Sequence, residues 1–73
     1  MEEWEHLFVT AKAHQGSLRP WQVDGQELPG WEEISITDYI GQVGEEGWEL
    51  SGVAISDIDA ETIRRLIFKR RKA

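Results

Sequence analysis

Cysteine is absent from this 73-residue sequence, and proline occurs only twice. Without cysteine, the chain has neither a disulfide nor a thiolate metal site to stabilise a small fold. A domain of this size buries only about 60% of the surface that its unfolded chain exposes, so its core leaves little margin of stability. We therefore expect residues 1–73 to form a single domain that depends on tightly packed aromatic side chains or on a second subunit.

Long apolar runs are also missing. No stretch approaches the roughly 20 apolar residues that a membrane-spanning helix needs. The beginning of the chain, MEEWEHLF, is acidic and lacks the basic start and the apolar segment of a secretory signal peptide. The sequence therefore predicts a soluble cytoplasmic protein that has no membrane partner.

Basic residues are scarce until the last part of the chain. Residues 1–63 contain all 14 acidic residues but only Lys12 and Arg19 as cations, a net charge of −12. Residues 64–73 carry a net charge of +6, and the whole chain carries −6. Such a separation is typical of a tail that binds an acidic partner, or of a basic strand that lies beside acidic ones.

The segment WEHLFVTAKA, residues 4–13, predicts a first strand. Its β-branched and aromatic residues alternate, so that Leu7 and Val9 lie on one face and Trp4 and Phe8 on the other. Because both faces carry apolar groups, we expect this strand to lie in the middle of a sheet or to be covered on both sides.

The dipeptide Asp24-Gly25 predicts a small hairpin. It separates two short runs that favour strands, residues 21–23 and 26–28. A type I′ turn needs positive φ at both of its central residues, and Asp-Gly accepts this conformation readily. The preceding segment HQGSLRP, residues 14–20, contains glycine and proline and is expected to be irregular.

The segment SITDYIGQVGEEG, residues 35–47, predicts a helix. Ser35 is suited to cap its start, and Gly47 is suited to end it in the left-handed conformation. Glycine inside a helix costs about 1 kcal/mol relative to alanine, so we expect Gly41 to mark the close approach of another group. The apolar residues at helical spacing are Ile36, Tyr39, Ile40 and Val43.

Two further strands are predicted after the helix, WELSGVAIS at residues 48–56 and TIRRLIFKRR at residues 62–71. A polar turn, Ser56 to Glu61, separates them, and Leu66 and Phe68 share one face of the last strand. The predicted fold class is α+β, a small antiparallel β-sheet with one α-helix packed on one face. The predicted order is strand, β-hairpin, helix, strand and strand.

Three segments carry a resemblance to a known family: WEHLFV, YIGQVGEEGWELSGVAIS and RLIFKRR. Together they resemble the small bacterial and phage family called domain of unknown function 4177, over roughly half of the chain. The sequence departs from the family pattern in its longer hairpin, VDGQELPGW, and at Gly41. The resemblance implies a compact fold of sheet and helix, and it implies no activity because none is assigned to the family as a whole.

Candidate metal ligands and catalytic residues are few. His6 and His14 are the two histidines, and the mostly extended chain between them would hold them far apart. The carboxylates flank the predicted elements instead of sharing an apolar pocket, and no nucleophile is paired with a base. The sequence therefore predicts no enzyme activity, no catalytic or metal-binding residue and no cofactor.

The basic end of the chain and two tryptophans are the candidate partner-binding residues. They are Arg64, Arg65, Lys69, Arg70, Arg71, Trp21 and Trp31. The cations could neutralise phosphates while the tryptophans stack bases. In the competing interpretation the cations pair with Glu2, Glu3 and Glu5 across the sheet. Because nucleic-acid-binding domains are usually positive overall, we expect pairing rather than nucleic-acid binding.

One helix covers only one face of the predicted sheet, although both faces carry apolar residues. Phe8 and Ile67 therefore need a second cover, supplied in part by Trp21 and Trp31 and otherwise by a second subunit. The sequence predicts a non-enzymatic interaction module that self-associates through the sheet as a homo-oligomer, with a dimer favoured. The identity of any other protein partner stays open. The alternative is a nucleic-acid-binding protein that uses Arg64 to Lys72.

Overall fold

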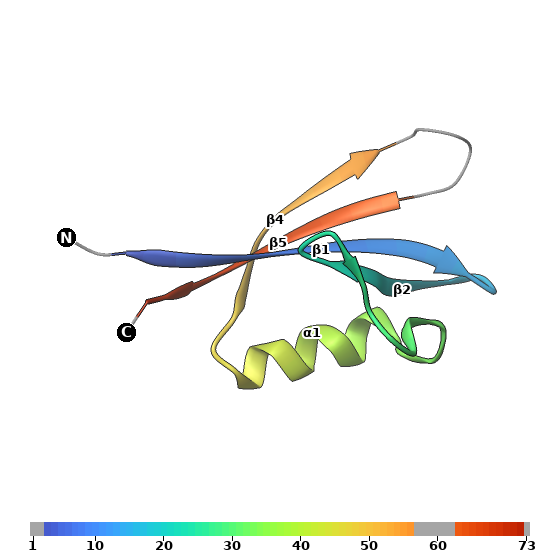
Figure 1. Ribbon diagram of the computed structural model, residues 1–73, viewed down its shortest axis with the longest axis horizontal. Helices are drawn as coiled ribbons and strands as arrows, with labels where there is room; N and C mark the ends of the chain where they lie inside the picture. The colour runs from blue at the N-terminus through green and yellow to red at the C-terminus, as the bar shows by residue number, and fades with distance from the viewer. Residues whose placement is uncertain (1–2, 57–62, 73) are drawn as a thin grey trace.

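The computed structural model describes residues 3–56 and 63–72. These residues form an α+β fold in which five antiparallel strands make one sheet and one α-helix covers one of its faces (Figure 1). The strands are β1 (Trp4–His14), β2 (Ser17–Val23), β3 (Gln26–Glu27), β4 (Glu49–Ser56) and β5 (Ile63–Arg71). The helix α1 (Ile36–Glu45) follows a short 3-10 helix, η1 (Trp31–Glu33).

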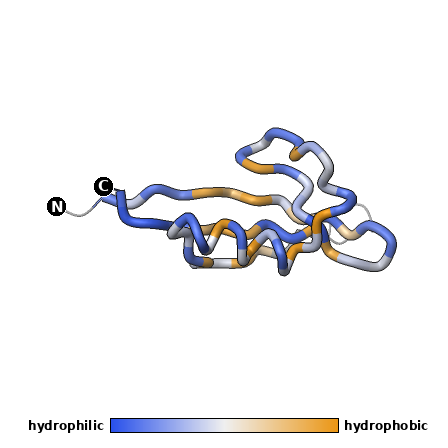
Figure 2. Tube along the Cα trace, turned by 90° about the horizontal axis from the view of Figure 1, so that it is seen from below, coloured by the Kyte–Doolittle hydropathy of each residue, from blue (hydrophilic) through white to orange (hydrophobic). Residues whose placement is uncertain are grey.

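The first and the last of these strands lie at the centre of the sheet. The strand order is β3-β2-β1-β5-β4, and residues 4–12 of β1 pair with residues 63–71 of β5. The backbone N–H of Lys72 donates to the carbonyl oxygen of Glu3 at 2.9 Å. The two ends of the described chain therefore lie side by side, as Figures 1 and 2 both show.

The core lies between the sheet and α1. It is formed by Val9, Ala11, Tyr39, Val43, Leu66 and Phe68. Val9 and Phe68 are almost completely buried, and they belong to the faces of β1 and β5 that the alternating pattern predicts. Burial raises the pKa of Tyr39 above its ordinary value, and the charges of Glu46 and Asp24 raise it further.

The end of α1 confirms the prediction for Gly47, which has a φ of 92°. The N–H of Gly47 donates to the carbonyl of Gly44 at 3.0 Å, and the N–H of Trp48 donates to that of Val43 at 3.1 Å. These two bonds form a Schellman motif, and Trp48 packs against the core. The glycine-rich stretch from residue 44 to residue 47 is therefore a helix end and not a ligand-binding loop.

The start of α1 is also confirmed, whereas the expectation for Gly41 is wrong. Ser35 Oγ accepts a hydrogen bond from the N–H of Asp38 at 3.0 Å and caps the helix. Gly41 is exposed, and a β-carbon added to it would meet no atom within 4 Å. Nothing among the described residues approaches this glycine closely, so its cost to the helix is not offset by tighter packing.

The predicted element order is right only in part: the helix lies between the third and fourth strands, and a tight turn joins β1 directly to β2, so that no separate strand and hairpin precede the helix. The turn at Asp24-Gly25 is confirmed, with φ values of 50° and 85°. Residues 14–20, predicted to be irregular, instead continue β1 and begin β2 through a second tight turn at Gln15-Gly16. The polar turn predicted for Ser56 to Glu61 lies, beyond Ser56, outside the described residues.

Pro20 lies inside β2 because the sheet is irregular at this point. It pairs with Ala11 next to a register shift at which β2 contains one extra residue, Trp21, and it is buried. The two residues of β3 pair only with Gln22 and Val23, so no described strand flanks Pro20 on its other side. An edge position beside a bulge tolerates a residue that has no N–H.

Candidate interaction surfaces

One face of the sheet lies opposite the face on which α1 packs, and we call it the open face. Its side chains include those of Trp4, His6, Phe8, Thr10 and Lys12 of β1, of Arg65, Ile67, Lys69 and Arg71 of β5, and of Arg19, which lies opposite Lys12 in β2. Phe8 is 46% exposed and Trp4 is 40% exposed. The open face therefore combines a row of aromatic side chains with a row of cations.

The two rows of the open face are in direct contact. The rings of His6 and Phe8 are stacked, with centroids 6.3 Å apart and planes inclined by 24°. Lys69 Nζ lies 4.7 Å from the centroid of the Trp4 ring, and the Arg71 guanidinium carbon lies 5.8 Å from it. Cations at such distances are attracted to the face of the indole ring.

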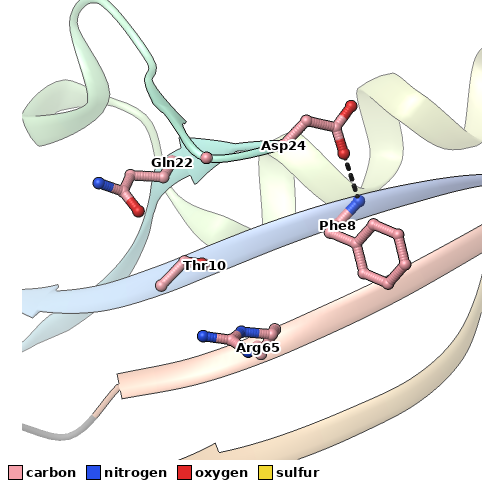
Figure 3. Close-up of a pocket in the computed structure, with 6 residues that line it drawn as sticks. Phe8, Thr10, Gln22, Asp24 and Arg65 are labelled. Atoms are coloured by element: carbon pink, nitrogen blue, oxygen red, sulfur yellow. Dashed lines mark hydrogen bonds between the residues drawn. The ribbon is translucent and has the colours of Figure 1, made fainter.

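An open hollow of about 360 Å³ lies beside Phe8 on the open face (Figure 3). It is lined by Phe8, Thr10, Gln22, Asp24, Gly25 and Arg65. The N–H of Phe8 donates to Asp24 Oδ1 at 3.0 Å, and the N–H of Asp24 donates to the carbonyl of Phe8 at 2.7 Å. These two bonds fix the turn that forms one rim of the hollow, while Arg65 lies on the opposite side.

The alternation of side chains along β5 divides the predicted basic site between the two faces. By strand register, Arg65, Lys69 and Arg71 belong to the open face, whereas Arg64 and Arg70 belong to the covered face. Figure 2 shows that the tube next to the C-terminus, where β5 ends, is blue and therefore hydrophilic. The sequence-predicted cations therefore do not form one site.

Arg70 stabilises the fold through three contacts. Its Nε donates to Glu5 Oε1 at 3.3 Å, and its Nη1 donates to the carbonyl of Glu46 at 3.0 Å, next to the end of α1. Its guanidinium carbon lies 4.3 Å from the centroid of the Trp48 ring. Arg70 thus joins β1, β5 and the helix end, which gives it a structural role.

The expected pairing of cations with the acids of the first strand is found at Arg70 and Lys72 in the part of the chain that the structure describes. Arg70 pairs with Glu5, and Lys72 Nζ lies 4.0 Å from Glu3 Oε2. Glu2 lies outside the described residues. Arg65, in contrast, faces away from these acids and has no ion pair in the described part of the chain.

Trp21 and Trp31 form a separate aromatic cluster instead of covering Phe8. Their ring centroids lie 6.5 Å apart, and Trp31 makes an edge contact with His14 at 5.3 Å. Trp21 Nε1 donates to Glu27 Oε1 at 3.3 Å, and Lys12 Nζ lies 4.7 Å from the Trp21 ring. The expected cover by these two tryptophans is therefore wrong for Phe8, which stays half-exposed.

Strand β4 is a second candidate surface, which we call the open edge. It ends the sheet, so the outer N–H and carbonyl groups of its backbone have no strand partner among the described residues. Leu50 pairs with Phe68 and Val53 pairs with Leu66, which places both on the covered face, yet they are 45% and 54% exposed. The apolar side of the sheet therefore extends beyond the area that α1 covers.

Neither a metal centre nor a membrane-spanning helix is found in the described segments. No group of three or more His, Cys, Asp or Glu within residues 3–56 and 63–72 could hold a metal ion. In the same residues no helix has both the length and the apolar character needed to cross a bilayer.

Comparisons with protein-family models, curated proteins and solved structures found no match to this chain. The resemblance to domain of unknown function 4177 stays a prediction.

Proposed function

We propose that this chain is a non-enzymatic interaction module that forms a homodimer by pairing the open edges of two copies. The observation that carries the proposal is the exposure of Leu50 and Val53 on an eight-residue strand at the edge of the sheet. An unpaired apolar strand is a template for a further strand, and soluble proteins usually block it with a charge, a proline or a cover. The only charged residue of β4 is Glu49, at its start.

A second copy fits the open edge because the strand is complementary to itself. A two-fold axis would place β4 antiparallel to its counterpart, as closed dimers require. In a register centred on Val53, this residue lies opposite its copy and Gly52 lies opposite Ala54. All residues from 50 to 56 are uncharged, so no like charges meet over this length. Directly opposed side chains then bring the two Val53 residues into contact.

The same arrangement would cover the apolar strip that α1 leaves bare. The two-fold axis of an antiparallel pair is perpendicular to the sheet, so both helices lie on the same side of the joined sheet. Leu50 and Val53 of each copy would then lie between the two helices. Burial of apolar area contributes about 25 cal/mol per Å², which favours the dimer.

The resemblance to domain of unknown function 4177 belongs to the same proposal. It is supported by the helix end at Gly47 and by the antiparallel pairing of the two strands that follow it. Both agree with the fold of sheet and helix that the resemblance implies.

The solution mass tests the dimer. Sedimentation equilibrium at micromolar concentration should give twice the chain mass of 8.4 kDa. Val53→Lys should give a folded monomer, because a lysine at the centre of the joined edge brings two positive charges together. Phe8→Lys is the matched control, since Phe8 is also about half-exposed but lies on the open face.

Three results would contradict the proposed contact. A monomer at high concentration would exclude self-association. A dimer that Val53→Lys leaves intact would exclude the open edge. A dimer that is lost only in Phe8→Lys would move the contact to the open face.

A further inference from the structure

We infer that the open face binds single-stranded nucleic acid, with bases stacked on Phe8 and Trp4 and phosphates neutralised by Arg65 and Lys69. The inference goes beyond the proposed dimer and does not depend on it, because the open face and the open edge are different surfaces. It rests on the charge of the face, on its aromatic row and on the hollow beside Phe8.

The charge of the open face has the opposite sign to that of the chain. By strand register and contact, its cations are Lys12, Arg19, Arg65, Lys69 and Arg71. The acids of this face in the described residues are Asp24, which lines the hollow, Glu27, which lies opposite Gln22 in the sheet, and Glu49, which lies opposite Lys69. Five cations and three acids give this face a local charge of +2, on a chain that carries −6. This local charge complements a polyanion and repels other cations.

The aromatic row distinguishes a nucleic acid from other polyanions. Trp4, His6 and Phe8 occupy alternate positions of one strand, so their side chains repeat about every 7 Å along it. Protein sheets that recognise single-stranded RNA stack two or three bases on exposed aromatic side chains. A duplex keeps its base faces inside, whereas a single strand presents them to such a row.

The hollow provides a place for one base beside Phe8. Its volume of about 360 Å³ is bounded by an aromatic ring, a guanidinium group, two polar side chains, Thr10 and Gln22, and the turn at Asp24-Gly25. The Asp24 carboxylate accepts the N–H of Phe8 through Oδ1. A base stacked on Phe8 would have the amide of Gln22 and the hydroxyl of Thr10 near its polar edge. Arg65, which has no ion pair among the described residues, would meet the adjoining phosphate.

Fluorescence anisotropy of a labelled oligothymidylate of about 12 nucleotides tests the inference. Binding should weaken steeply between about 50 and 200 mM salt, because each neutralised phosphate releases counterions. Arg65→Gln should weaken binding several-fold and reduce the log–log salt slope by about 0.7. Arg64→Gln is the matched control, since it removes the same charge from the neighbouring residue on the covered face.

A second variant separates stacking from charge. Phe8→Leu keeps the charge and an apolar side chain but removes the ring, and it should weaken binding roughly 5- to 150-fold. The dimer variant Val53→Lys should keep the affinity per chain, because it leaves the open face unchanged. Circular dichroism and thermal unfolding establish that each variant is folded.

Four results would overturn the inference. The first is the absence of binding at about 50 mM salt. The second is an equal loss of affinity in Arg64→Gln and Arg65→Gln, which would indicate a non-specific effect of charge. The third is unchanged affinity in Phe8→Leu. The fourth is equal competition by a heparin fragment or a polyglutamate peptide, which would assign the open face to acidic partners in general.

Discussion

The two faces of the sheet are built from the same strands but differ in chemistry. On the covered face, Val9 and Phe68 are almost completely buried beneath α1. On the open face, the alternate residues of β1 and β5 include Phe8, half-exposed, and Arg65. Because neighbouring residues of a strand point to opposite sides, one strand supplies both a core and a surface. A substitution that changes the surface should therefore leave most of the stability intact.

The largest expected difference between the faces concerns their two phenylalanines. Phe68→Ala should lower the free energy of unfolding by about 3–5 kcal/mol, since it leaves a cavity in the core. Phe8→Ala should lower it by about 1 kcal/mol or less, because the side chain is already half-exposed. Urea denaturation at one fixed protein concentration measures both. Similar losses would show that the open face is buried in an assembly.

Two neighbouring arginines of β5 provide a smaller contrast. Arg70→Gln should lower the free energy of unfolding by about 1–2 kcal/mol, since it breaks the contacts with Glu5, Glu46 and Trp48. Arg71→Gln should cost about 0.5 kcal/mol, because Arg71 is exposed. Urea denaturation of the two variants at one fixed protein concentration compares their free energies of unfolding. A larger loss for Arg71→Gln would reverse the assignment of structural and surface cations.

Glycine-to-alanine substitution should destabilise α1 at one position and stabilise it at another. Gly47→Ala should lower the free energy of unfolding by about 1 kcal/mol or more, since alanine is strained at a φ of 92°. Gly41→Ala should raise it by up to about 1 kcal/mol, because the added methyl group meets no atom. Thermal unfolding measured by circular dichroism compares the two. Equal effects would remove the assignment of Gly47 as the helix end.

The smallest expected effect is a pH dependence on the covered face. Tyr39 has a raised pKa in the folded protein, so the unfolded chain ionises first as the pH increases. Its contribution to stability is therefore complete below about pH 10 and is lost as the pH rises through the folded-state pKa. Tyr39 is the only tyrosine, so ultraviolet absorbance follows its titration directly. Titration of Tyr39 at its ordinary pKa would contradict its burial. Tyr39→Phe should remove the part of the alkaline loss of stability that comes from ionisation of this side chain.

Local chemistry was sufficient to predict several elements from the sequence. The turn at Asp24-Gly25, the cap at Ser35 and the helix end at Gly47 each depend on a few adjacent residues. The second turn was missed because Gln15 has a φ of 53°, a conformation that glutamine seldom adopts. The strand that contains Pro20 was missed because the register shift that tolerates it depends on a neighbouring strand.

The candidate surfaces were less predictable than the elements. The alternation that placed Phe8 and Leu7 on different faces also separates Arg65 from Arg64, so the division of the basic end follows from the sequence. The open edge does not follow from the sequence, because the exposure of Leu50 and Val53 depends on the order of the strands and on how far α1 extends over the sheet. Those properties are set by pairings between segments that are distant in the chain.

The central position of β1 and β5 has a consequence for how the protein is made. Trp4 pairs with Arg71, so the middle of the sheet cannot close until almost the whole described chain has left the ribosome. Before β5 emerges, β1 has only β2 to pair with. The aromatic side chains of β1 then stay accessible to chaperones or to other nascent chains. Loop closure over this separation also slows folding relative to a fold built from local contacts. The emergence of β5, and not that of the helix, is thus the event that permits the sheet to close.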